Sequence, residues 1–419
     1  MDALLGWDRE ALQRFRDALA HDPALAVAHA GAALCLFLDE RFEEARAAAA
    51  EARRAAAGQT PRERSHVEAL ARLVTGDTRG AEEVMREHLA AWPRDLVIAQ
   101  RLYFVWFWQG RFPEMLALTR ALVRWAPGDS FALGLHAFAL EQAGRCDEAV
   151  RVAGAALVAN PRDAWAVHAL AHALYELGAF DTGVRVLPGR IHPCTHLGWF
   201  RNHLLWHLAL LHLSAGDLER ASAIARATFE RRPSAIAGDL HDAISFLWRL
   251  ELLGRPPGAR WRPFVEIART RLDREGLLFH AVHLAMALAA GGDWATAERQ
   301  LATLRARATR DPGGPVEAVV VPLVEGIHAF AAADYLRAVA RLERAMPRLI
   351  ELGGSRAQRD VFEDTMLEAC FRAGDDTRAR QRLAARLARR PDRYWLARRA
   401  GSTPAGVPAG AACAVTSRA

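Results

Sequence analysis

Histidine side chains recur at helical spacing in the middle of this sequence. His168, His172 and Glu176 are spaced i, i+4 and i+8, which places them on one stripe of a helix. His203 and His207 repeat the four-residue spacing about one repeat later. An imidazole beside a carboxylate can act as a general acid–base pair, with the carboxylate orienting the ring. Buried histidines can also hydrogen-bond to backbone or carboxylates within helix contacts, so the spacing alone leaves both interpretations open.

Aromatic and charged residues extend this pattern along the chain. Arg359 could clamp a carboxylate or phosphate, or form a surface pair with an aspartate.

Our leading hypothesis is a binding protein that holds a small molecule or an extended peptide in a concave groove. If the chain is instead an enzyme acting on a small polar substrate, the catalytic candidates are His172, His207 and Asp242. A scaffold that docks another protein is the third alternative. The predicted ligand-binding residues are His168, His172, Glu176, His203, Trp206, His207, Asp242, Trp248 and Arg359.

A metal site is a further interpretation of the histidine pairs, because imidazoles at i and i+4 near a carboxylate can hold a divalent cation. The sequence lacks the glutamate of a His-Glu-x-x-His hydrolase, and ligands carried on three separate helices could lie too far apart. We therefore expect no metal site. The sequence identifies no cofactor.

Aromatic residues precede and adjoin the histidine stripe. Trp165 and Tyr175 lie next to it in sequence and could stack on a planar ligand. An earlier group could form an apolar wall of the groove, although ordinary repeat packing explains each member equally well. This group comprises Phe104, Phe107, Trp108, Phe131 and Phe138.

The spacing of glycine and proline predicts the elements that position these side chains. Pro93, Pro127 and Pro161 lie 34 residues apart, and a small or unbranched residue precedes each by twelve positions. Glycines recur with the same period, at positions 76, 110, 144 and 178. A fixed 34-residue period of glycine, small residue and proline is typical of helix–turn–helix solenoids. We predict an all-α, right-handed solenoid of about ten hairpins, with first helices lining the inside and second helices covering the outside.

Irregular positions interrupt the period at both ends and in the middle. The chain begins inside a repeat, because residues 11–23 carry the spacing of a second helix without a full first helix before it. Residues 188–193 read as a turn-rich insertion after a helix that ends at Leu187. We expect one repeat domain over residues 1–400 and a disordered tail over residues 401–419, which are mostly Gly, Ala, Ser, Thr and Pro.

Composition excludes several classes of function. All 55 basic residues are arginine, so neither a lysine Schiff base nor a P-loop lysine is possible. The net charge of +6 is small and spread along the chain, so we expect no nucleic-acid partner. No apolar run approaches the ~18 residues of a membrane span, and we expect no membrane partner. Five scattered cysteines without a Cys-x-x-Cys pair indicate a reducing, cytoplasmic location. A homodimer is possible.

The repeat spacing resembles the tetratricopeptide repeat superfamily over nearly the whole chain. A narrower resemblance, to the tetratricopeptide repeat protein 38 family, rests on four segments that occur in order. That resemblance implies a fold and a set of pocket positions rather than a reaction. The chain departs from the family at Arg356, where a histidine would be usual. The four segments are His168-Ala-Leu-Ala-His172, His203-Leu-Leu-Trp206-His207, Asp242 ahead of Leu247–Glu251, and Gly354–Asp360.

Overall fold

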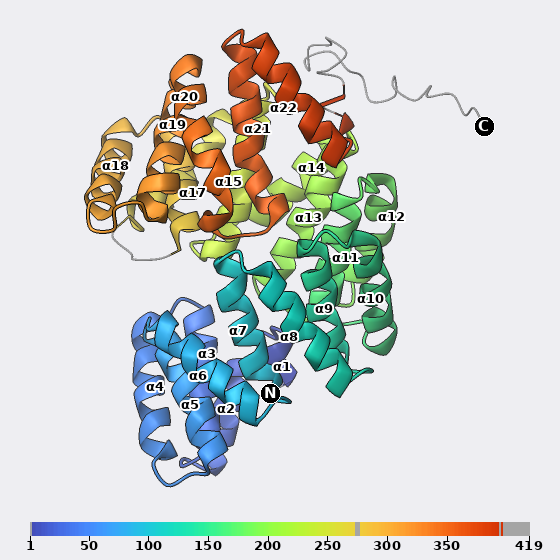
Figure 1. Cartoon of the computed structure of the whole chain (residues 1–419), viewed down its shortest axis with the longest axis vertical. Coiled ribbons are helices and arrows are strands. Elements are labelled where there is room, and N and C mark those ends of the chain that lie inside the picture. The colour runs from blue at the N-terminus through green and yellow to red at the C-terminus, as the bar shows by residue number, and fades with distance from the viewer. Residues whose placement is uncertain (1, 273–276, 394, 397–419) are drawn as a thin grey trace, which may run out of the picture. The chain divides into compact units, whose positions relative to one another are not determined.

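The computed structural model describes residues 2–272, 277–393, 395 and 396. Within these residues the secondary structure is helical, and the only β-type pairing is an isolated bridge between Asp8 and Leu197. The predicted all-α class is confirmed (Figure 1). None of the described helices is long and apolar enough to cross a bilayer.

Twenty helices, α3 to α22, follow one another as ten first-helix and second-helix pairs in the described part of the chain, and α1 and α2 precede them. The count agrees with the predicted number of hairpins. The helices are α1 (Asp2–Leu5), α2 (Ala11–His21), α3 (Ala26–Leu38), α4 (Phe42–Ala56), α5 (Pro61–Val74), α6 (Thr78–Ala91), α7 (Leu96–Trp108), α8 (Phe112–Trp125), α9 (Ser130–Gln142), α10 (Cys146–Ala159), α11 (Ala164–Glu176), α12 (Phe180–Ile191), α13 (Phe200–Ser214), α14 (Leu218–Ala225), α15 (Ala237–Leu252), α16 (Arg262–Arg269), α17 (Leu278–Ala290), α18 (Trp294–Ala308), α19 (Val321–Ala331), α20 (Tyr335–Ala345), α21 (Arg356–Arg372) and α22 (Asp376–Arg389).

The periodic glycines end the first helices. Gly76 and Gly110 adopt φ of 89° and 70°, the left-handed conformation that closes a helix and that glycine reaches without a steric penalty. Gly144 and Gly178 repeat it in the next two pairs. Two pairs lack the glycine. Ala333, after α19, takes the same position with φ of 60° despite its Cβ atom.

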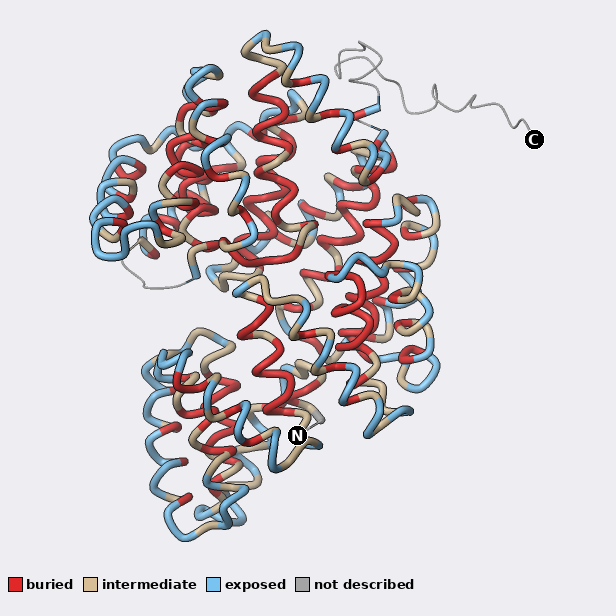
Figure 2. Tube along the Cα trace, viewed as in Figure 1, coloured by how far each residue is buried: buried red, intermediate tan, exposed pale blue. Residues whose placement is uncertain are grey.

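First and second helices differ in burial (Figure 2). In α7 nearly every side chain is buried, whereas in α8 only Met115, Thr119 and Leu122 are. The sequences of these two helices explain the difference, because α7 is apolar on most sides while α8 carries one apolar stripe. The periodic small residues face the first helices, and Ala149 is an example that packs with Leu140 and Ala173.

The chain separates into two compact units. Unit 1 comprises residues 1–173 and 187–204, and unit 2 comprises residues 174–186 and 205–419. A single domain over residues 1–400 stays a prediction. The predicted disordered tail, residues 401–419, lies outside the described residues.

The predicted insertion at residues 188–193 is wrong for residues 188–191. Helix α12 continues through Pro188 to Ile191. A proline inside a helix removes one hydrogen bond, yet Leu187 and Ile191 are both buried one turn apart and anchor this last turn. The chain leaves the helix only after Ile191.

Candidate functional site

Two first helices of unit 1 bring three predicted histidines together. His168 and His172 lie one turn apart on α11, with ring centroids 4.5 Å apart. His203, near the start of α13, places its Nε2 atom 3.1 Å from Nε2 of His168. One ring nitrogen from each of the three lies within 4.8 Å of the others. We call these three residues the histidine cluster. All are buried, and none is more than 8% exposed.

Local capping fixes the start of α11. The Asp163 carboxylate accepts the backbone N–H of Ala166 at 3.0 Å, which satisfies a donor in the first helical turn. Asp163 is itself buried, and this burial raises its pKa to about 6. The rigid helix start sets the rotation of α11 and therefore the direction of His168 and His172.

Burial controls the charge of the histidine cluster. It lowers the pKa of His168 well below its ordinary value, and the nearby His172 and His203 rings lower it further. His168 is therefore neutral at pH 7. A carboxylate lies beside the cluster, since Oε2 of Glu141 is 3.6 Å from Nδ1 of His172. Glu141 in turn accepts a hydrogen bond from the Gln142 side chain at 2.5 Å.

Aromatic rings surround the histidine cluster in unit 1. Phe138 lies 4.8 Å from His168 and 4.9 Å from His172, centroid to centroid. Trp165 packs edge-on against His168 at 5.1 Å, and Phe200 stacks on His203 at 5.7 Å. Two members of the predicted wall, Phe104 and Phe138, are therefore part of this arrangement, since Phe104 contacts Trp165 at 4.9 Å.

Residues 4–9 cover this aromatic group. The Trp7 ring lies 5.9 Å from Phe104, 5.3 Å from Trp165 and 5.0 Å from Phe200. It also contacts Trp199 at 5.1 Å. We call the surface under Trp7, formed by Phe104, Trp165, Trp199 and Phe200, the aromatic cradle. It belongs to the first helices α7, α11 and α13 and to the residue before α13.

The backbone of residues 4–9 is also held by unit 1. Gln100 on α7 donates its side-chain N–H to the carbonyl of Leu5 at 3.1 Å. Arg9 donates its backbone N–H to the carbonyl of His196 at 3.1 Å, beside the bridge between Asp8 and Leu197. Sequence reasoning missed this segment, because it treated residues 1–6 as part of an incomplete first helix. The available signal was Trp7, an aromatic residue outside any helical phase.

Predicted site residues in unit 2 are buried and engaged in packing. Trp206 donates its indole N–H to Ser245 at 3.2 Å, and Trp248 donates to Thr365 at 2.9 Å. Both rings are buried, so they hold first helices together in this state rather than lining an open groove. His207 is also buried, with its ring centroid 4.8 Å from that of Trp206.

The remaining predicted positions in unit 2 have polar contacts. Glu176 accepts a hydrogen bond from Arg390 at 3.0 Å. Asp242 is buried, and its backbone carbonyl accepts the hydroxyl of Ser245 at 3.1 Å. Arg359 is buried and donates to the carbonyl of Gly354. The alternative of a surface pair for Arg359 is therefore wrong, because the residue faces inward at the start of α21.

Comparison with known proteins gives distant structural matches. No protein-family model matches the chain. The human IFIT1 dimer with m7Gppp-AAAA is 12% identical, covers 92% of this chain and 96% of its own, and has a TM-score of 0.44. The Cut9–Hcn1 hetero-tetramer of APC/C is 11% identical, covers 78% of this chain and 62% of its own, with a TM-score of 0.41. MamA MSR-1 C2 is 18% identical over 44% of this chain and 97% of its own, with a TM-score of 0.30.

The repeat architecture is tetratricopeptide-like. Its hairpins, its left-handed glycines and its division into buried first helices and one-sided second helices are the observations that carry this conclusion. The narrower resemblance to the tetratricopeptide repeat protein 38 family stays a prediction.

A buried ionic network in unit 2 was also missed from the sequence. Asp360 on α21 accepts hydrogen bonds from Arg389, at 2.8 Å, and from Arg390. Arg386 pairs with Asp364 at 3.0 Å. Arg390, just after α22, is 0% exposed and reaches back to Glu176. The network ties the end of α22 to the end of α11.

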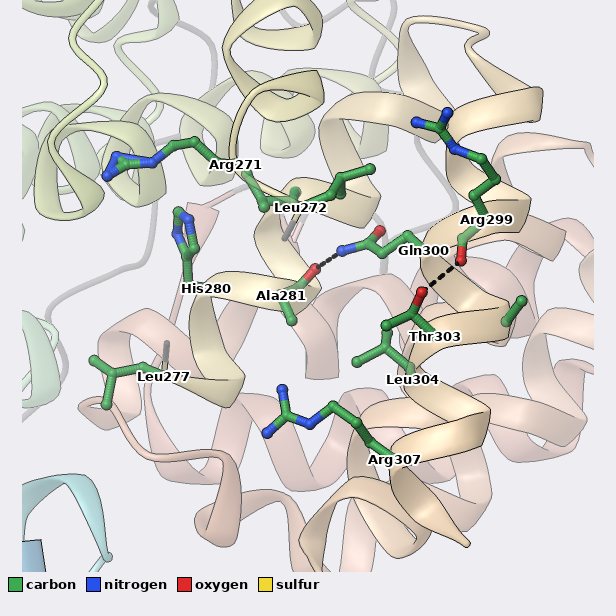
Figure 3. Close-up of a pocket in the computed structure, with 12 residues that line it drawn as sticks. Arg271, Leu272, Leu277, His280, Ala281, Arg299, Gln300, Thr303, Leu304 and Arg307 are labelled. Carbon is green, nitrogen blue, oxygen red and sulfur yellow. Dashed lines mark hydrogen bonds between the residues drawn. The ribbon is translucent and has the colours of Figure 1, made fainter. Parts of the chain in front are cut away.

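A cavity of about 430 Å³ lies elsewhere in unit 2, beside α17 and α18 (Figure 3). Its polar lining includes Arg271, Arg299, Arg307 and Gln300. In Figure 3 the three guanidinium groups point in different directions, so they do not converge on one anion. None of the nine predicted ligand-binding residues lines this cavity, and we do not assign it a function.

Proposed function

We propose that this protein is a tetratricopeptide-like binding protein whose unit 1 captures a short peptide segment with an aromatic side chain. One observation carries the proposal: residues 4–9 of the chain itself, which form the end of α1 and the turn after it, lie against the first helices of unit 1 with one aromatic side chain in the aromatic cradle. Their backbone is held by hydrogen bonds and their single aromatic side chain enters the aromatic cradle. Main-chain contacts combined with one side-chain pocket are a recurring mode of peptide recognition.

The chemistry of the cradle favours an aromatic ligand over an aliphatic one. Edge-on ring contacts add attraction beyond the area that they bury, by about 0.5–1.5 kcal/mol per pair. Arg101 lies over the Phe104 ring at 4.9 Å and near the Trp7 ring at 6.0 Å, which adds a cation–π contact. Arg101 is buried, and burial lowers its pKa to about 9, so it remains charged at pH 7.

Residues 4–9 occupy this surface at a cost, which makes them displaceable. Trp7 has a φ of 57°, a left-handed conformation that costs a non-glycine residue about 1–2 kcal/mol. Its indole N–H has no hydrogen-bond partner among the described residues, and such a buried donor costs about 1–3 kcal/mol. A partner peptide that places its ring without these two penalties would compete well with the tethered segment.

The enzymatic alternative receives less support from the site. Acid–base chemistry needs a substrate within hydrogen-bond reach of the imidazoles. The histidine cluster is buried beneath Phe138, Trp165 and Phe200, so a substrate would first have to displace these rings.

The test uses a peptide in trans. A fluorescein-labelled peptide with the sequence of residues 3–10 is titrated with the parent chain and with a Leu5→Ala/Trp7→Ala double variant, and anisotropy is measured. In the parent the tethered copy competes at an effective concentration of order millimolar, so we expect apparent binding about 100-fold weaker than to the double variant. Trp125→Ala alters an exposed tryptophan on α8 and serves as the matched control, which should behave as the parent does. The proposal is wrong if the peptide binds the parent and the double variant with the same affinity, or if it binds both weakly or not at all.

A further inference from the structure

We propose that the histidine cluster of unit 1, His168, His172 and His203, is a binding site for a divalent transition metal of the zinc type. This inference is independent of the peptide-binding proposal and concerns the layer beneath the aromatic cradle. Imidazole nitrogens suit zinc, copper and nickel, and zinc sites built on three histidines are well established in proteins.

The nitrogen positions are close to those that a tetrahedral metal requires. Zinc–nitrogen bonds of ~2.0–2.1 Å at a tetrahedral angle place two ligand nitrogens roughly 3.3 Å apart. The Nε2 atoms of His168 and His203 are 3.1 Å apart. The third nitrogen, from His172, lies within 4.8 Å of both, so the His172 ring would have to move closer to complete the site. We expected no metal site because ligands on three separate helices could lie too far apart. These three histidines lie on two helices, and their nitrogens are close together.

A carboxylate is placed where the outer layer of a metal site needs one. Glu141 on α9 lies 3.6 Å from Nδ1 of His172, so Nε2 would be the nitrogen of that ring that binds the metal. Histidine ligands typically give their second nitrogen to a carboxylate or carbonyl, which fixes the ring and raises its basicity. Glu141 is buried, so its negative charge would also offset part of the charge of a dication held in the same interior.

A second group of ligand-type residues in unit 1 provides a contrast. His66 and His88 both contact the same Asp95 oxygen, at 2.9 and 3.2 Å. The other Asp95 oxygen accepts the backbone N–H of Ile98 at the start of α7. This carboxylate already has partners on both oxygens, and the two imidazoles satisfy it directly. The group therefore has a structural role, and it supplies a control for the metal experiment.

The experiment uses the full chain after chelator treatment. Co²⁺ is titrated in, and its visible d–d absorption reports a tetrahedral nitrogen-rich site, with Zn²⁺ added afterwards as the competitor. We expect one equivalent of Co²⁺ to bind and Zn²⁺ to displace it. His172→Gln and His203→Gln should each weaken Co²⁺ binding at least 100-fold, and Glu141→Gln should weaken it about 10- to 100-fold. His66→Gln should bind as the parent does.

Folding of the variants is checked by circular dichroism, because each substituted residue is buried. If the cluster variants do not fold, X-ray absorption of the zinc-loaded parent decides the question. It should show about three imidazole ligands at zinc–nitrogen distances of ~2.0–2.1 Å. The proposal is overturned if the parent binds no Co²⁺, if binding is lost in His66→Gln instead, or if the absorption spectrum shows a carboxylate-dominated site.

Discussion

Neutralising Asp360 is the substitution for which the structure gives the clearest stability prediction. In Asp360→Asn the side chain keeps its shape, but it loses its charge within the buried network at the end of α22. Burial alone would raise the pKa of Asp360, and the positive charges of Arg390, Arg386 and Arg389 outweigh burial and hold that pKa well below its usual range. Asp360 is therefore ionised in the folded protein at pH 7.

The size of the effect depends on the other carboxylates that the arginines still contact after Asp360 is neutralised. Removing one partner from a buried ion pair typically costs about 3–5 kcal/mol, because the other charge stays buried. Arg390 retains Glu176 and Arg386 retains Asp364, at 3.0 Å in both pairs. Because these partners compensate part of the loss, we expect the lower end of the range, about 3 kcal/mol.

Hydrogen exchange of the full chain, followed by mass spectrometry, measures this loss locally. Amides of α21 and α22 report the free energy of opening in unit 2, even where the two units unfold separately. Asp376→Asn is the matched control, because Asp376 is exposed in the first turn of α22 and should change opening by less than about 0.5 kcal/mol. If Asp360→Asn lowers the opening free energy by no more than this control, the network does not stabilise unit 2 and our reasoning about it is refuted.

Three further substitutions test local features. Ala333→Gly should stabilise the α19–α20 turn by about 1 kcal/mol in urea unfolding, because Ala333 has a φ of 60°, whereas the neighbouring Ala332→Gly should not stabilise. Burial lowers the pKa of His283 to about 3 in the folded protein, so its contribution is present above pH ~6.5 and is lost as the pH falls below that value. Between pH 7 and pH 5 this loss of unfolding free energy is about 2 kcal/mol in the parent. His283→Gln should lose correspondingly less over the same pH range, and a variant with the same pH dependence as the parent would contradict the assignment. Thr60→Ala removes the capping box with Glu63 at the start of α5 and should lower the free energy of urea unfolding by about 1 kcal/mol. An effect no larger than that of an exposed Ser→Ala substitution elsewhere would contradict the role of the cap.

The fold was predictable because the residues that end its helices can be recognised in the local sequence. Gly76 and its periodic equivalents mark positions where the backbone must be left-handed, and this requirement is visible in sequence as a glycine. The continuation of α12 past Pro188 was not predictable from the residue type alone, because burial of Ile191 decides it.

The candidate site was predictable only in part. The helical period places His168 and His172 on one stripe of a first helix, and the repeat places His203 on the next first helix. No periodic pattern connects Trp7 or Arg390 to the residues that they contact, because those contacts join segments far apart in the chain. Long-range contacts of this kind need the structure.

Photo-crosslinking is the most direct test of the central claim, that the first-helix surface of unit 1 binds a short peptide segment with an aromatic side chain. The peptide of residues 3–10 carries a benzophenone amino acid in place of tryptophan, and it is irradiated with the Leu5→Ala/Trp7→Ala variant. We predict that cross-links map by mass spectrometry to α7, α11 and the start of α13, around Phe104, Trp165 and Phe200. Cross-links on second helices, such as around Trp125 of α8, or cross-links of equal yield with a scrambled peptide, would contradict the account.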